Sequence, residues 1–302
     1  MINNSKSFLR TIVRVFALVL VLSMMLVGCE EEPPKRVFPD YNNSNNSNNS
    51  GNSNKNTSKP NNSSNNNSNS NSNNNSNNNS NNSVNVNSNS SGKKRVAITY
   101  DDGPHNVNTV KIADELAKYG FHATFFVVGN RIDGTEYNGA KGLKYAASKG
   151  NEIAIHGYSH KQDKDHYYDT CPPATFKSEL ADTKDAILDQ LPNAKIKLMR
   201  PIGGRITDER VSSCGYAVIQ WSVDSLDWKY KYDGQPGVDA IVNNVMSQAK
   251  NGSIILMHDL YENTYLATKE ILKQLNAQGY EVVTVSELLG NPKAGVEYSK
   301  AS

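Results

Sequence analysis

The sequence has little charge of one sign, few cysteines and no long apolar run. Its 302 residues carry 32 Lys and Arg against 30 Asp and Glu, a formal net charge of +2, and 3 Cys. This near balance excludes the strongly basic character expected of a nucleic-acid-binding protein. The apolar run over residues 15–27 is too short to span a bilayer with ease. A polytopic membrane protein is therefore excluded as well.

Apolar residues make up only 37% of the chain, and the deficit is confined to one segment. Residues 41–92 contain 27 Asn and 16 Ser among 52 positions. Such a segment buries almost nothing and cannot offset the entropy lost on ordering, so we predict a disordered tether over 29–92. The remaining 302 − 92 = 210 residues are enough for one domain with a core. We predict that domain over 93–290, followed by a C-terminal tail over 291–302.

The N-terminus has the features of a bacterial secretion signal. Basic residues precede the apolar run, whose end, Leu26-Val27-Gly28-Cys29, resembles a lipobox. We therefore predict a signal peptide over 1–28 and lipidation of Cys29, which would anchor the protein to the cell membrane. The alternative is an uncleaved short membrane anchor with an incidental cysteine. Both interpretations place the rest of the chain outside the cytoplasm.

Beyond residue 92 the sequence alternates between buried strands and helices. Apolar runs predict strands at Val96–Tyr100, Ala123–Val128, Ile153–Ile155, Ile196–Met199, Ala217–Val223, Ile254–Met257 and Val282–Val285. Helical patterns lie between them at Val110–Tyr119, Lys141–Lys149, Thr175–Leu191, Val238–Lys250 and Thr264–Gln278. The alternation predicts an α/β body with a parallel sheet. Its length favours a distorted (β/α) barrel of seven or eight strands, and an open doubly wound sheet is the alternative.

Titratable side chains lie at the carboxyl ends of the predicted strands. They are Asp101, Asp102, His156, His160, Arg200, Asp224 and His258. In a parallel α/β body these ends meet at one face, where active sites are built. Two histidines and one carboxylate form a common catalytic metal set, so we predict such a set at Asp102, His156 and His160. Taken singly, the His pair could be two surface histidines and the Asp pair a turn cap.

Five short motifs contain these residues. They are Thr99-Tyr100-Asp101-Asp102-Gly103-Pro104, His156-Gly157-Tyr158-Ser159-His160, Arg200-Pro201-Ile202-Gly203-Gly204, Asp224-Ser225-Leu226-Asp227-Trp228 and Leu256-Met257-His258-Asp259. Their types and order resemble the NodB-type polysaccharide deacetylases, carbohydrate esterase family 4, from about residue 95 to 288. The resemblance implies a metal-dependent hydrolase that removes acetyl groups from an extracellular polysaccharide.

The resemblance also implies a role for each motif residue. The ion would be zinc by preference, with cobalt or another divalent metal as alternatives, and the predicted His and Asp set would hold it. Asp101 would act as the base and Arg200 would orient it. His258 would act as the acid that protonates the leaving nitrogen, and Asp224 would hold His258.

The substrate side of the site departs from the family pattern in two motifs. The resemblance assigns the oxyanion to the backbone N–H of Gly203, but Gly203 and Ile202 replace an aromatic residue and a proline. Gly157 stands where Ser or Thr is frequent, and we expect this to affect loop stability more than chemistry. Aromatic faces suit the apolar side of a pyranose, so Tyr158 and Trp228 are candidates for substrate contact, with core or rim packing as the alternative.

Together these features predict the removal of N-acetyl groups from an amino-sugar polymer. Peptidoglycan N-acetylglucosamine is preferred because the membrane anchor and tether place the domain beside the wall. The alternatives are an O-acetyl esterase on xylan, a chitooligosaccharide deacetylase and an inactive carbohydrate-binding lipoprotein. We expect a monomer with no nucleic-acid partner. Cys171 and Cys214 could form a disulfide outside the cytoplasm or remain free thiols.

Overall fold

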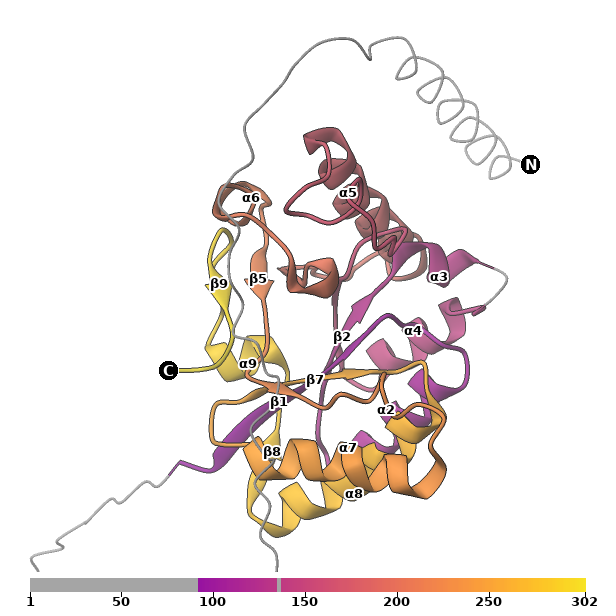
Figure 1. Ribbon diagram of the computed structural model, residues 1–302, viewed down its shortest axis with the longest axis vertical. Helices are drawn as coiled ribbons and strands as arrows, with labels where there is room; N and C mark the ends of the chain where they lie inside the picture. Colours follow the sequence, from indigo (N-terminus) through magenta and orange to yellow (C-terminus); the bar gives the residue numbers. More distant parts are fainter. Residues whose placement is uncertain (1–91, 135–136) are drawn as a thin grey trace, which may run out of the picture. The chain divides into compact units, whose positions relative to one another are not determined.

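The computed structural model describes residues 92–134 and 137–302 (Figure 1). The predicted signal peptide, Cys29 and all but the last residue of the predicted tether lie outside the described residues. Within the described ranges, no helix is both long enough and apolar enough to cross a bilayer.

The described chain forms one sheet of parallel strands. They are β1 (Lys94–Asp101), β2 (Thr124–Val127), β3 (Glu152–Ile155), β4 (Leu198–Met199), β5 (Ala217–Ile219), β6 (Val223–Asp224), β7 (Ile254–His258), β8 (Tyr280–Val282) and β9 (Glu297–Tyr298). The order across the sheet is β6-β7-β1-β2-β3-β4-β5-β9, and β8 pairs with the start of β1. The central position of β1 places its carboxyl end, Asp101, between β7 and β2.

The sheet curls back on itself. In the strand order, β5 and β6 lie near opposite ends, yet only residues 220–222 separate them in the sequence. Four residue steps reach at most about 14 Å, so the two ends of the sheet must approach each other. The fold is therefore a distorted (β/α) barrel, as the sequence predicts, rather than an open doubly wound sheet.

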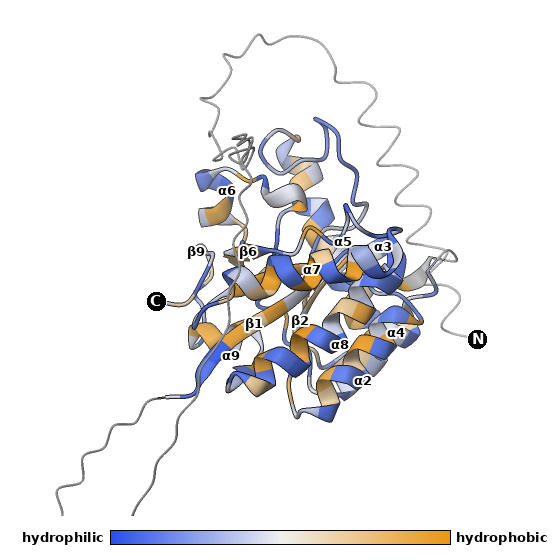
Figure 2. Cartoon of the chain, turned by 60° about the horizontal axis from the view of Figure 1, so that its bottom comes forward, coloured by the Kyte–Doolittle hydropathy of each residue, from blue (hydrophilic) through white to orange (hydrophobic). Residues whose placement is uncertain are grey.

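Helices cover the outside of the curled sheet. They are α2 (Asn108–Lys118), α3 (Gly129–Asp133), α4 (Ala140–Ser148), α5 (Pro173–Gln190), α6 (Asp208–Ser213), α7 (Gly234–Gln248), α8 (Glu262–Ala277) and α9 (Val285–Leu289), with a 3₁₀ turn η1 at Ile202–Gly204. In α8 the apolar residues Ala267, Ile271 and Leu275 recur at helical spacing and are fully buried. Figure 2 shows the same division, with apolar residues in β1 and β2 and polar residues on the outer sides of α2 and α8.

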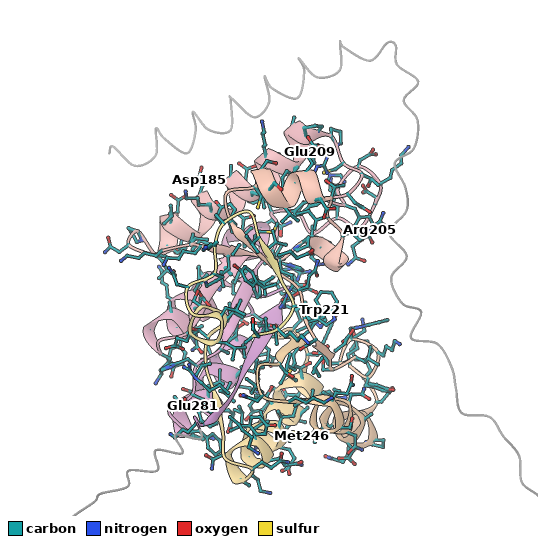
Figure 3. All side chains as sticks on the ribbon, turned by 90° about the vertical axis from the view of Figure 1, so that its left-hand side faces the viewer. Asp185, Arg205, Glu209, Trp221, Met246 and Glu281 are labelled. Atoms are coloured by element: carbon teal, nitrogen blue, oxygen red, sulfur yellow. The ribbon has the colours of Figure 1, made fainter. Side chains whose placement is uncertain are left out.

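The two faces of β1 enter two different apolar clusters. Ile98 and Tyr100 belong to the large cluster between the sheet and the helices, whereas Ala97 belongs to a small cluster on the other face. Because strand side chains alternate between faces, Asp101 shares the inner face with Ala97. Trp221, labelled in Figure 3, also packs against the inner cluster. Asp101, the last residue of β1, therefore faces the interior of the barrel at the carboxyl end of the strand.

Three boundaries differ from those predicted. The strand predicted at Ala217–Val223 is two strands, β5 and β6, because the carbonyls of Ile219 and Gln220 accept hydrogen bonds from Arg200. The last predicted strand, Val282–Val285, lies earlier as β8, and Val285 instead begins α9. The segment 291–302, predicted as a tail, adds β9 beside β5.

Candidate active site

One cavity opens at the carboxyl ends of the strands. Its volume is about 420 Å³, and its lining contains residues from all five motifs: Asp101, Asp102, His156, His160, Gln162, Pro201, Gly203, Gly204, Trp221, Asp224, Trp228, Lys231, Leu256, His258 and Tyr261. The strand ends thus bring together most of the predicted site residues. Arg200 lies behind the lining, fully buried, and Tyr158 is not among the lining residues.

Asp102, His156 and His160 form a group with the geometry of a metal site. One ligand atom of each lies within 4.8 Å of the others. Nε2 of His160 lies 2.8 Å from Oδ1 of Asp102, and Nε2 of His156 lies 3.4 Å from the same oxygen. Burial raises the pKa of the Asp102 carboxyl, but the two imidazoles outweigh that effect and hold the pKa well below its usual value. The carboxylate is therefore anionic at neutral pH, as a metal ligand must be.

The hydrogen bonding of His156 fits a cation between these residues. Its Nδ1 lies 3.0 Å from the carbonyl oxygen of Arg200, and a carbonyl can only accept, so Nδ1 carries the hydrogen. In the neutral ring, Nε2 then presents a lone pair to Oδ1 of Asp102. That oxygen is buried and accepts no hydrogen bond from the described residues. Two acceptors that face each other in this way are stabilised by a shared divalent ion.

The backbone at Asp102 explains how two adjacent aspartates enter one cavity. On a regular strand Asp101 and Asp102 would point to opposite faces. Asp102 instead has φ = 71°, a left-handed conformation that is uncommon for a non-glycine residue. The guanidinium of Arg131 donates to the Asp102 carbonyl and holds this turn. A Cβ at the next residue, Gly103, would collide with the buried carboxylate of Asp259, so any other residue there would have to displace that carboxylate.

Arg200 donates hydrogen bonds both to β1, which carries Asp101, and to the end of β5. Its Nη1 donates to Oδ1 of Asp101 and to the Thr99 hydroxyl, both at 2.7 Å. Its Nε and Nη2 donate to the carbonyls of Ile219 and Gln220, both at 3.0 Å. The ion pair predicted between Arg200 and Asp101 is present. It leaves the other carboxylate oxygen of Asp101, Oδ2, facing His156 at 3.7 Å.

The loop that carries both histidines is held from behind by Glu179 of α5. Oε2 of Glu179 accepts hydrogen bonds from the backbone N–H groups of Tyr158 at 2.6 Å and Ser159 at 2.9 Å. Gly157 has φ = 97°, and a Cβ there would lie 2.4 Å from the hydroxyl of Tyr168. The glycine is thus required by its surroundings, and Glu179 supplies the hydrogen bonds that order the loop.

We expect Glu179→Gln to weaken divalent-metal binding about tenfold, because both loop N–H groups bond to Oε2 and a neutral amide oxygen accepts them more weakly than a carboxylate oxygen does. The histidines on that loop then lose their fixed positions. Isothermal titration of the metal-free protein with zinc measures the change. Glu270→Gln, at an exposed carboxylate of α8, is the control and should bind zinc as the parent does. Equal affinity in both variants would show that Glu179 does not position the ligands.

His258 is held by Asp227 and not by Asp224, which corrects the prediction from the sequence. Nδ1 of His258 lies 2.7 Å from Oδ1 of Asp227, whose other oxygen accepts from the Thr264 hydroxyl and the His258 N–H. The cause is local. Leu226 has φ = 56°, and its N–H is bonded to Oδ1 of Asp224 at 2.8 Å. This turn directs Asp227 beneath the imidazole and leaves Asp224 in the cavity wall.

The pair with Asp227 controls the charge of His258. Burial lowers the pKa of His258, but the negative charge and hydrogen bond of Asp227 outweigh it, and the result is a rise to about 10. Asp102 and Asp101 act in the same direction. Since Nδ1 is occupied by Asp227, Nε2 is the nitrogen left for the cavity. The imidazole is therefore a protonated donor at neutral pH.

The remaining predicted substrate residues lie in different places. Gly203, with φ = 60° and ψ = 20° in η1, lines the cavity, and the nearest side chain to a Cβ built there is Tyr167 at 3.4 Å. Trp228 stands at the cavity rim and is 47% exposed. Tyr158 turns away and packs on Gly129 of α3, where a Cβ would lie 2.4 Å from its ring. Its predicted substrate contact therefore has no support in the geometry.

Several residues of the described site have roles that were not assigned from the sequence. Asp227 had a usable signal, since it is the second carboxylate of its motif. Glu179, Gln162 and Lys231 belong to no motif and become relevant only through their positions. Outside the site, Cys171 and Cys214 are free thiols.

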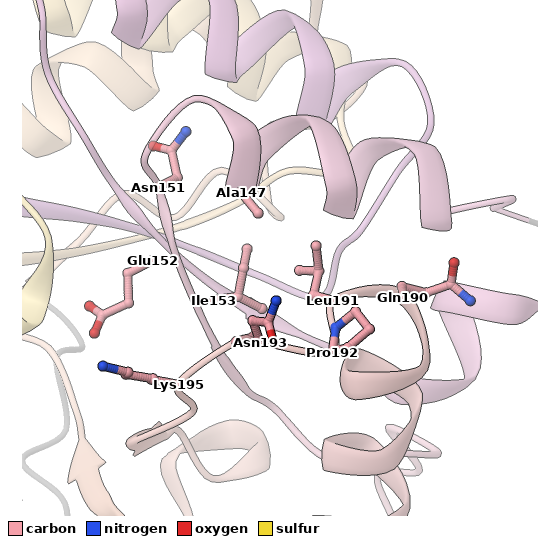
Figure 4. A pocket seen from close by; sticks show the side chains of 10 residues that line it. Ala147, Asn151, Glu152, Ile153, Gln190, Leu191, Pro192, Asn193 and Lys195 are labelled. Atoms are coloured by element: carbon pink, nitrogen blue, oxygen red, sulfur yellow. The ribbon is translucent and has the colours of Figure 1, made fainter.

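A second cavity of about 380 Å³ lies at the opposite, amino-terminal end of β3 (Figure 4). It is lined mainly by the start of β3 and the connection that follows α5. Glu152 is its one carboxylate, and that group already accepts from the hydroxyls of Thr124 and Ser286. No cluster of catalytic groups faces this cavity in the described chain, so the chemistry belongs to the first.

Comparison with known proteins agrees with this geometry. The profile of the polysaccharide deacetylase family matches residues 88–219. Over 202 residues the chain is 38% identical to the peptidoglycan-N-acetylmuramic acid deacetylase PdaC of Bacillus subtilis, which covers 65% of this chain and 39% of PdaC. It is 34% identical over 207 residues to a peptidoglycan-N-acetylglucosamine deacetylase of Bacillus cereus, which covers 66% of this chain and 90% of that protein.

The solved structure of PdaC from Bacillus subtilis is similar to the described fold. The TM-score is 0.56 at 36% identity, and the match covers 65% of this chain and 90% of the solved one. The chain spans about two fifths of the full length of the curated PdaC. The similarity thus concerns the barrel that carries the site.

Proposed function

Because the chain belongs to the polysaccharide deacetylase family, we propose that it hydrolyses the N-acetyl groups of peptidoglycan, with N-acetylglucosamine as the preferred sugar. The observation that carries the proposal is the single cavity in which a His-His-Asp group, a carboxylate held by arginine and a protonated histidine meet. The relatives named for peptidoglycan support the choice of polymer. They act on both amino sugars of the wall by name, so the preferred sugar has to be measured.

The reaction needs a base, a stabiliser of negative charge and an acid, and the cavity offers each. Asp101 takes the proton of the attacking water on Oδ2, because Arg200 already occupies Oδ1. His258 donates the proton on Nε2 to the leaving nitrogen, which otherwise would depart as an unstable amide anion. Gly203 lines the cavity, and its backbone N–H is the donor proposed for the tetrahedral oxygen.

The His-His-Asp group is proposed to hold a divalent ion, with zinc preferred. Two imidazoles and one carboxylate suit zinc and leave positions open for water and substrate. When bound, such an ion supplies Lewis-acid chemistry, since it withdraws electron density from the oxygen atoms that it contacts.

We further propose that the protein is a monomeric lipoprotein of the outer face of the bacterial membrane. The support for the lipid anchor is the sequence of residues 1–92 alone: a signal-like apolar run, Cys29 in a lipobox context and a polar tether. The tether, of 63 residues, has an r.m.s. span of about 45 Å as a flexible coil. That reach suits a domain that works on a polymer around the cell.

A panel of acetylated substrates tests the proposed activity. The full chain, loaded with zinc, is incubated with peptidoglycan, chitooligosaccharides and acetylated xylan, and released acetate is measured. We expect the highest kcat/KM on peptidoglycan. Faster release from xylan would show an O-acetyl esterase, and no release from any substrate by folded, metal-loaded protein would leave a carbohydrate-binding protein.

A further inference from the structure

The cavity wall contains a lysine that the reaction above does not use. Lys231 lies in the connection between β6 and α7 and lines the cavity beside Trp228 and Tyr261. Its ammonium nitrogen lies 5.2 Å from the ring centroid of Tyr261 and 5.2 Å from that of Tyr232. The side chain is half-buried. Tyr261 lines the cavity and Tyr232 is 84% exposed, so the two rings place the cation at the mouth of the cavity.

The other charged groups of the cavity wall already have partners in the protein. Asp101 is paired with Arg200, His258 with Asp227, and Asp224 accepts the N–H of Leu226. Asp102 belongs to the His-His-Asp group.

Lys231, by contrast, makes no hydrogen bond or ion pair with any residue that the structure describes. A cation held by two rings but left without a counter-charge is available to an anion on the ligand.

We propose that Lys231 binds a carboxylate of the substrate, so that the site selects an anionic amino-sugar chain over a neutral one. This inference rests on the proposed function, because it assumes that a glycan occupies the cavity. A wall glycan carries carboxylates on its lactyl ether and peptide substituents, whereas chitin carries none. Lys231 is then a specificity-determining residue that acts on substrate binding and takes no part in proton transfer.

The neighbouring lysine provides a matched control within the same loop. Lys229 also stands over an aromatic ring, that of Trp228, at 5.2 Å. It is exposed and is not among the residues that line the cavity. A general attraction of the basic loop for an anionic polymer would involve both lysines, whereas the proposed contact involves Lys231 alone.

Two tetrasaccharides of equal length test the proposal. Both alternate N-acetylglucosamine with N-acetylmuramic acid; one has free lactyl carboxylates, and the other has them converted to methylamides. We expect the parent protein to prefer the charged form. Lys231→Gln should lower the charged-to-neutral ratio of kcat/KM about fivefold, mainly through KM. Lys231→Arg should keep the ratio, and Lys229→Gln should leave it unchanged.

Three outcomes would overturn the inference: an unchanged ratio in Lys231→Gln, an equal drop in Lys229→Gln, or no preference in the parent. Raised salt should reduce the parent's preference toward that of Lys231→Gln, since screening weakens the pair. Mass spectrometry of the products shows which sugar lost its acetyl group, and thus whether the bound carboxylate lies on the reacting sugar or its neighbour. Failure to release acetate from either tetrasaccharide and from peptidoglycan would instead refute the proposed function.

Discussion

Asp101→Asn is expected to lower the rate of acetate release roughly a thousandfold while zinc remains bound. The amide cannot take a proton from water, but it keeps the size of the carboxyl and one oxygen for the hydrogen bond from Arg200. Asp102→Asn should lose both activity and metal, because it removes the negative charge that the two imidazoles face. Acetate release and bound zinc per chain, measured on the same preparations, check both results.

The pair of variants separates the two adjacent aspartates, which the sequence alone cannot do. Loss of zinc from Asp101→Asn would place that residue among the ligands and reverse the proposed division of labour. Circular dichroism of each variant serves as the folding control, since Arg200 would be left buried with a weaker partner in Asp101→Asn.

Asp227→Asn is the substitution with the second large expected effect. It should change the pH dependence of the rate of acetate release. The negative charge of Asp227 raises the pKa of His258 to about 10, so the acid stays protonated up to that pH. Without this charge the pKa falls toward the ordinary histidine value of 6.5, and the alkaline limb of the rate profile should move down by roughly three pH units. At pH 9 we expect roughly a hundredfold loss of rate, measured as acetate release between pH 6 and 10.

The same pairing contributes to the free energy of unfolding with a defined sign. A histidine whose folded pKa lies near 10, against 6.5 unfolded, stabilises the fold fully below about pH 6.5. That contribution is lost as the pH rises through the folded value.

Asp224→Asn is the control for Asp227→Asn. Asp224, the last residue of β6, accepts the N–H of Leu226, whereas the imidazole makes its hydrogen bond with Asp227. The pH profile of Asp224→Asn should keep the alkaline limb of the parent. If Asp224→Asn moves the limb and Asp227→Asn does not, the original assignment of Asp224 from the sequence would be restored.

The position of the site could be predicted because it depends on topology. Continuous apolar runs predict strands that are buried on both faces, and such strands are typical of a parallel sheet. The carboxyl ends of parallel strands meet at one edge of the sheet. Asp101, Asp102, His156, His160 and His258 each stand at such an end, so their meeting follows from the fold class.

The misassigned contacts depend instead on single backbone angles. The exchange of Asp224 for Asp227 results from a left-handed leucine, Leu226, and a leucine carries no sequence signal for that conformation. The direction of Tyr158 depends in the same way on the turn at Gly157. The break between β5 and β6 depends on Arg200, about twenty residues earlier in the chain. The local sequence around the break therefore does not predict it.

The guanidinium of Arg200 links β1, β4 and β5 across the inside of the barrel, and the same group orients Asp101. The same residue, Arg200, therefore stabilises the barrel and orients Asp101. A substitution of Arg200 would therefore weaken the barrel and misplace Asp101 together, because both depend on the same four hydrogen bonds.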